Sequence, residues 1–100
     1  MLVDFERSGG FAGITLRTSI DTSKLSPADA SQLEQMIRDS SFFNLPEQMN
    51  SPTGAADLFE YHLTISSPQP AHSVIVYQGA VPAGLQPLID RLTDLARKRA

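Results

Sequence analysis

Short runs of alternating apolar and polar residues constrain the fold of this chain more than any other feature. Such alternation is typical of β-strands that bury one face. The first two runs span residues 2–7 and 14–21 and flank the turn signal Ser8-Gly9-Gly10. The next two span residues 58–66 and 72–78 and flank the turn Ser67-Pro68-Gln69-Pro70. The pattern therefore predicts four strands that pair as two hairpins.

Two further segments carry helical signals. Ser26 suits an N-cap, Pro27 the first helical position and Asp29 the positive end of the helix dipole, so a helix is predicted from Ser26 to about Ser40. A second helix is predicted from Pro82 or Pro87 to the C-terminus. The apolar stripes of the two helices are Ala30, Leu33, Met36 and Ile37, and Leu85, Leu88, Leu92, Leu95 and Ala96.

The predicted order ββαββα defines an α+β fold. Each strand has one apolar face and each helix one stripe, which favours a four-stranded, mainly antiparallel sheet with both helices packed on one face. The 100 residues are expected to form a single domain. Antiparallel neighbours and short connections would bring three segments to one end of the sheet, namely 8–13, 47–56 and 79–83. The segment 47–56 is predicted to be a long loop.

Charge and composition exclude several classes of function. The net charge is -3, and three of the eight basic residues lie in the last four positions, so the body of the domain is more acidic still. An acidic body argues against nucleic acid and anionic membranes as partners. There is no cysteine, which removes disulfides, thiolate metal sites and cysteine nucleophiles. No signal peptide or membrane-spanning run is recognised, so a cytoplasmic location is expected.

No set of residues suits catalysis, and the chain is predicted not to be an enzyme. The two histidines, His62 and His72, are predicted to face Val76 and Ser66 across the second hairpin, about 13 Å apart and both toward solvent. They would not share a metal ion. Acidic residues on the exposed sheet face, Asp4, Glu6 and Glu60, are expected to be solvated, with Arg17 as a cross-strand partner. No metal or cofactor is expected.

The first hairpin tip is the most unusual feature of the chain. Gly9-Gly10-Phe11-Ala12-Gly13 places three glycines around one aromatic residue. Two interpretations stay open: the glycines serve only the turn while Phe11 folds onto the sheet, or Phe11 is presented as an anchor for a binding partner.

The same stretch carries a family resemblance. Residues Phe5 to Ile14 (FERSGGFAGI) resemble the N-terminal signature of the emfourin family, small bacterial proteins that inhibit protealysin, a thermolysin-like zinc metalloprotease. Further similar stretches are 42–46 (FFNLP), 57–61 (DLFEY) and 87–92 (PLIDRL), in the order of the family. The resemblance implies a protease inhibitor that blocks the active-site cleft of a thermolysin-like or protealysin-like metalloprotease.

The implied inhibitory surface coincides with the end where the three segments are predicted to meet. The candidate protease-binding residues are Gly9, Gly10, Phe11, Ala12, Gly13, Pro52, Thr53, Gly54, Gly79 and Ala80. The alternative is a non-inhibitory interaction module that uses the exposed sheet face with Arg17, Glu60 and His62. A third interpretation, a small-ligand binder, would need a pocket. A monomer or a weak dimer is expected, because Ile75 and Tyr77 could form a small apolar patch.

Overall fold

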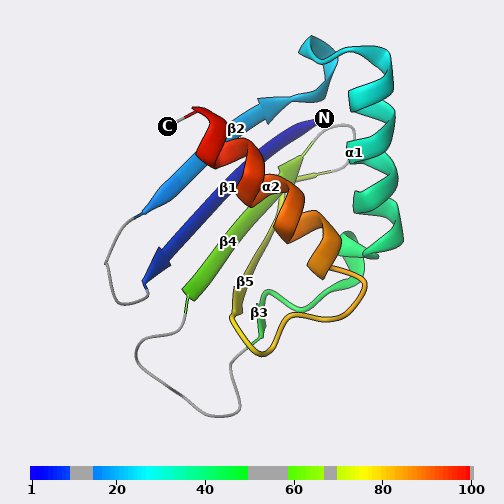
Figure 1. Ribbon diagram of the computed structural model, residues 1–100. Coiled ribbons are helices and arrows are strands. Elements are labelled where there is room, and N and C mark those ends of the chain that lie inside the picture. Colours follow the sequence, from blue (N-terminus) through cyan, green and yellow to red (C-terminus); the bar gives the residue numbers. More distant parts are fainter. Residues whose placement is uncertain (10–14, 50–58, 67–69, 100) are drawn as a thin grey trace.

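A mixed five-stranded sheet carries two α-helices on one face. The computed structural model describes residues 1–9, 15–49, 59–66 and 70–99 (Figure 1). The strands are β1 (Leu2–Gly9), β2 (Leu16–Asp21), β3 (Gln48–Met49), β4 (Phe59–Ser66) and β5 (His72–Tyr77). The helices are α1 (Pro27–Asp39) and α2 (Gln86–Arg99), with short 3-10 turns at Thr22–Lys24 and Phe42–Asn44. None of the helices in these ranges is long and apolar enough to cross a membrane.

The strand order is β2-β1-β4-β5-β3, which confirms the α+β class and corrects the predicted number of strands. The pairs β1–β2, β1–β4 and β4–β5 are antiparallel, as expected. The added strand β3 lies in the segment predicted to be a loop and pairs in parallel with β5. It occupies the free edge of β5, where the Ile75 N–H donates to the Glu47 carbonyl oxygen at 2.8 Å. Two residues are too few to show alternation, so tertiary pairing alone creates this strand.

Local signals place α1 where the sequence predicts it. The Ser26 side chain accepts a hydrogen bond from the Asp29 N–H at 3.2 Å, and Pro27 occupies the first turn. Leu33 and Ile37 are the buried members of its stripe, whereas Ala30 and Met36 are half-buried. The helix ends at Asp39 and is followed by the C-cap Ser40, whose Oγ donates to the Ile37 carbonyl oxygen at 2.7 Å.

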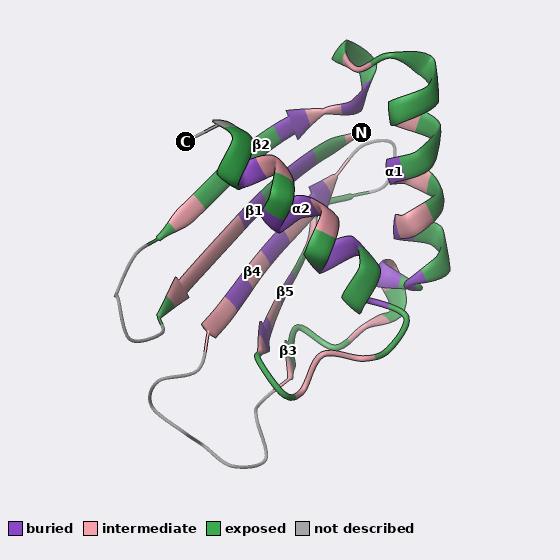
Figure 2. Ribbon diagram, in the orientation of Figure 1, coloured by how far each residue is buried: buried purple, intermediate pink, exposed green. Residues whose placement is uncertain are grey.

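One hydrophobic core joins the two layers. Along the strands, burial alternates with the sequence as predicted (Figure 2). The buried strand residues form one cluster with the buried residues of both helices. The most completely buried side chains are Phe42, Ile37, Leu63, Ile65, Leu85, Leu88, Ile89, Leu92, Val3, Val74 and Val76. Because both helices contribute to the same cluster, the domain has a single core rather than two.

Ser41 follows α1 in a left-handed conformation, with φ 54° and ψ 39°. For residues other than glycine, this conformation costs about 1–2 kcal/mol of stability. Ser41→Gly is therefore expected to raise the free energy of unfolding by up to about 1 kcal/mol, measured by urea denaturation. Ser40→Gly is the matched control, because Ser40 has an ordinary φ of -78° and a side-chain hydrogen bond to lose. Equal destabilisation by both variants would contradict the strain at Ser41.

Candidate functional site

The strand ends that flank the three predicted segments gather at one end of the sheet, called here the loop end (Figure 1). Gly9, the last residue of β1, pairs with Phe59, the first residue of β4. The Gln78 N–H, just after β5, donates to the Phe59 carbonyl oxygen at 2.9 Å. Leu16, the first residue of β2, pairs with Arg7. These contacts tie the starts and ends of four strands into one continuous surface.

Three of the residues predicted to bind a protease lie in the described part of the chain, all at the loop end. Gly9 is in β1 rather than in a turn, because β1 continues two residues past its predicted end; its φ of 88° favours glycine. Gly79 has a φ of 90°, and the Ala80 N–H closes the turn on the Tyr77 carbonyl oxygen at 2.9 Å. The other predicted residues, Gly10, Phe11, Ala12, Gly13, Pro52, Thr53 and Gly54, lie outside the described residues.

Two residues at the loop end were missed by the sequence analysis. Arg7 is in phase with Val3 and Phe5, so its side chain lies on the helix side of the sheet, not with Glu6. Phe59 begins the buried face of β4, and the Arg7 Cζ lies 4.2 Å from the centre of the Phe59 ring. The alternation of the predicted strand 58–66 already placed Phe59 on this face, and the alternation of the predicted strand 2–7 places Arg7 there too. What was missed is that the two side chains meet at the loop end.

The outer face of the sheet is polar, and its side chains bind one another. Arg17, predicted to partner the acidic residues of this face, forms an ion pair with Glu6, with Nε and Oε2 2.8 Å apart. The Ser19 hydroxyl donates to Asp4 at 2.7 Å. The hydroxyl oxygens of Thr64 and Ser73 lie 2.8 Å apart. These partners across β2, β1, β4 and β5 satisfy the polar groups within the sheet itself.

Glu60 is the centre of a second group on this face. Its carboxylate accepts hydrogen bonds from the Tyr77 hydroxyl and from His62 Nε2, the latter at 2.8 Å. These two bonds lower the pKa of Glu60 below its ordinary value of 4.5. The bond between Tyr77 and Glu60 also raises the pKa of the Tyr77 hydroxyl. The Tyr77 hydroxyl is thus bound to a carboxylate, while its ring and Ile75 lie half-buried on the same outer face.

Tyr77→Phe is expected to return the pKa of Glu60 toward its ordinary value of 4.5, because the first cause of its lowering is removed. Folding lowers this pKa, so the ionised carboxylate stabilises the domain above pH 4.5 and the contribution is lost as the pH falls through the lowered value. An NMR titration of the Glu60 carboxyl carbon measures the change. Tyr61→Phe is the control, since Tyr61 lies on the helix side. An unchanged Glu60 pKa in Tyr77→Phe contradicts the prediction.

The two histidines lie on opposite faces of the sheet, and their predicted environments were partly wrong. His62 pairs with Ile75 and His72 with Ile65, one residue from the predicted register. His72 is not on the solvent side: its ring lies 5.3 Å from that of Phe42, and its Nε2 donates to the Leu45 carbonyl oxygen at 2.9 Å. His72 lies on the same face of β5 as the buried Val74 and Val76, so the alternation within this strand already indicated its position on the core side. The described ranges contain no group of three or more metal-ligating side chains.

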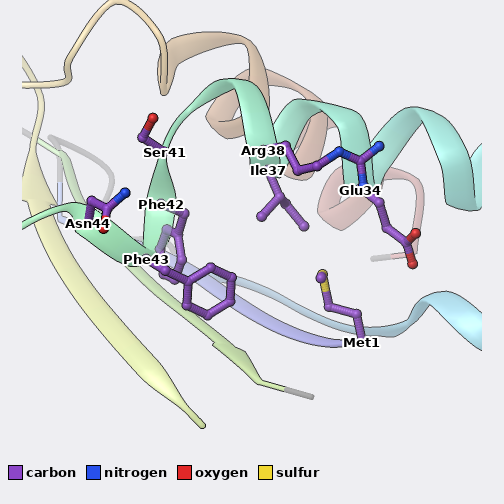
Figure 3. A pocket seen from close by; sticks show the side chains of 8 residues that line it. All are labelled: Met1, Glu34, Ile37, Arg38, Ser41, Phe42, Phe43 and Asn44. Carbon is purple, nitrogen blue, oxygen red and sulfur yellow. The ribbon is translucent and has the colours of Figure 1, made fainter. Parts of the chain in front are cut away.

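A groove beside α1 is the structure's candidate for small-ligand binding (Figure 3). Its volume is about 440 Å³, and its apolar lining comes from Met1, Ile37, Phe42 and Phe43. The charged side chains at its rim are engaged elsewhere: Glu34 accepts from the Thr22 hydroxyl at 3.0 Å, and Arg38 donates to Gln35 at 2.9 Å. The groove is near the start of β1, whereas the loop end lies where β1 finishes, and its lining holds no histidine or cysteine.

The fold and this arrangement define a small α+β domain that presents the ends of several strands on one side. The chain belongs to the emfourin family, whose family model matches residues 5–93. The match begins in β1 and ends within α2, so it spans every strand. No significantly similar curated protein and no significantly similar solved structure was found.

Proposed function

We propose that this protein inhibits a thermolysin-like or protealysin-like zinc metalloprotease by binding across its active-site cleft. The observation that carries the proposal is the membership of the emfourin family over residues 5–93, because the sequence resemblance to that family implies such an inhibitor. The family is one of inhibitors, in keeping with the proposal that the chain is not an enzyme. The target protease would supply the zinc ion, and this chain offers no thiolate to bind it.

The proposed mechanism uses the loop end. The segment from Gly9 to Gly13 enters the cleft, and the neighbouring segments with Pro52 to Gly54 and Gly79 to Ala80 widen the contact. Thermolysin-like enzymes prefer a large apolar residue just after the scissile bond, and Phe11 supplies one. Support comes from β1, which is paired with β2 as far as Arg7 and with β4 as far as Gly9, the first residue of this segment. Holding the base of the segment in place lowers the entropy lost on binding.

Titration of the purified protein into a thermolysin-like zinc protease, ideally one encoded beside it, tests the proposal. The buffer contains no chelator, and a serine protease serves as the control. The expected result is saturable inhibition of the metalloprotease alone, complete near one equivalent. A protein shown to be folded that leaves its neighbouring metalloprotease active would argue against the inhibitor function.

The alternative, an interaction module without inhibitory activity, would use the outer face of the sheet with Arg17, Glu60 and His62. Both helices of the described ranges, α1 and α2, lie on the opposite face of the sheet (Figure 1). However, Arg17 is paired with Glu6, and Glu60 with His62. A partner would have to compete with these pairs or bind around them. Amide hydrogen exchange in the complex distinguishes the two surfaces, because protection at residues 16–21 and 60–64 without protection at the loop end favours the alternative.

A further inference from the structure

Arg7 is the one cation in the described ranges that is seen stacked on an aromatic ring, and it lies at the loop end. Its Cζ is 4.2 Å from the centre of the Phe59 ring. Its Nε is buried and has no hydrogen-bond partner in the described part of the chain. A buried donor without an acceptor costs roughly 1–3 kcal/mol, and folded proteins keep few of them. This unpaired group therefore needs an explanation.

The carboxylates nearest to Arg7 in sequence and in register are engaged on the other face of the sheet. Glu6 pairs with Arg17, and Asp4 accepts from Ser19. Glu60, which pairs with the residue after Arg7, accepts from Tyr77 and His62. The ion pairs found among the described residues do not include Arg7. Among the described residues of a chain whose net charge is -3, this guanidinium is a positive group with no ion-pair partner.

The surface around Arg7 opens toward the loop end. Along β4 the relative exposure rises from 1% at Leu63 to 9% at Tyr61, and Phe59 is half-buried (Figure 2). On the other side of Arg7, its β2 partner Leu16 is also half-buried. Arg7 thus lies between two partly exposed apolar side chains, two residues before Gly9. A protein that contacts the loop end would exclude water from this place.

We propose that Arg7, held flat on Phe59, binds an aspartate or glutamate side chain of the target protease. This inference rests on the proposed inhibitor function and names the chemistry of one contact within it. Stacking on Phe59 fixes the plane of the guanidinium and leaves its N–H groups, which point outward in that plane, to donate two parallel hydrogen bonds to a carboxylate. The apolar neighbours shield this ion pair from water, which strengthens it. A carboxylate bound to the terminal N–H groups of the guanidinium neutralises its charge.

Inhibition constants of Arg7 variants test the inference. Arg7→Gln is expected to raise the inhibition constant by about 30-fold or more, as for an arginine at the centre of an interface. Arg7→Lys keeps the charge but loses the paired donors and the stacking, so it is expected to recover little of the inhibition. Arg17→Gln is the matched control, because Arg17 is exposed on the outer face and paired with Glu6; its inhibition constant is expected to stay within about twofold of wild type.

A direct measurement accompanies the kinetics. The Arg7 Nε–Hε signal in NMR spectra is expected to move downfield and to be protected from exchange when the wild-type protein binds the protease. A purely structural role for Arg7 would leave this signal unchanged on binding. Thermal unfolding of each variant shows whether it is folded, and if Arg7→Gln is not folded, Arg7→Lys replaces it in the test.

The possible outcomes separate this inference from the function on which it rests. If wild type inhibits while a folded Arg7→Gln or Arg7→Lys variant inhibits equally well, the inhibitor function stands and the carboxylate contact is overturned. If wild type does not inhibit at all, the proposed function fails and the contact fails with it. Weaker inhibition by both Arg7 variants, unchanged inhibition by Arg17→Gln and a shifted Nε–Hε signal support the contact.

Discussion

Phe42→Ala is expected to lower the free energy of unfolding by about 3–5 kcal/mol. Phe42 is 1% exposed and is the largest fully buried side chain among the described residues. Its ring meets the edges of two others, Phe43 and His72, each with the ring centres 5.3 Å apart. It therefore links the turn after α1 to the start of β5. Removing it leaves a cavity between elements that the rest of the core holds apart.

Guanidinium denaturation measures the loss. Since small domains have a total stability of about 5–15 kcal/mol, the variant is expected to lose a third or more of it. Phe43→Ala is the matched control. The Phe43 ring is only half-buried, so its removal is expected to lower the free energy of unfolding by clearly less. If Phe42→Ala stayed within about 1 kcal/mol of wild type, the 42–44 turn would not be packed into the core as described.

Phe11→Ala is expected to weaken inhibition of the target protease by about 2 kcal/mol or more, which is a rise in the inhibition constant of about 30-fold. The reason is the proposed role of Phe11 as the apolar side chain that fills the pocket just after the scissile bond of a substrate. The three glycines around it supply little bulk of their own, so the loss would not be compensated by a neighbour. Tight-binding inhibition kinetics with the folded variant measure the effect.

Leu2→Ala is the control for this experiment. Leu2 is a large apolar residue with 47% exposure at the opposite end of β1, so losing its side chain is expected to leave the inhibition constant unchanged. Inhibition by Phe11→Ala that matches wild type would remove Phe11 as the anchor but leave the inhibitor function in place. Comparable losses in both variants would instead indicate a general effect on the fold.

Much of the fold was predictable because the signals are local. Alternation within each strand chose its buried face, and Ser26 with Pro27 placed the start of α1. The cross-strand pair of Arg17 with Glu6 was also predictable, because both residues lie on the polar face of the first hairpin. Each of these features depends on residues close in sequence or joined by a single turn, so the pattern itself contains the information.

The candidate site was predictable only in outline. Antiparallel neighbours and short connections predicted that three connecting segments lie at one end of the sheet. The positions of the described strand ends agree with this prediction. The family resemblance directed attention to Gly9 through Gly13. Arg7 and Phe59 were missed because their pairing joins β1 to β4, which are about fifty residues apart in sequence, and the sheet order was not known.

By itself, the sequence determined the order of the main elements, their buried faces and the membership of the emfourin family. Only the tertiary structure decided the strand order, the fifth strand and the stacking of Arg7 on Phe59. The physical reason is the range of the interactions. Periodicity and capping act between residues a few positions apart, whereas these three features arise when distant segments compete to cover the same edge or face of the sheet.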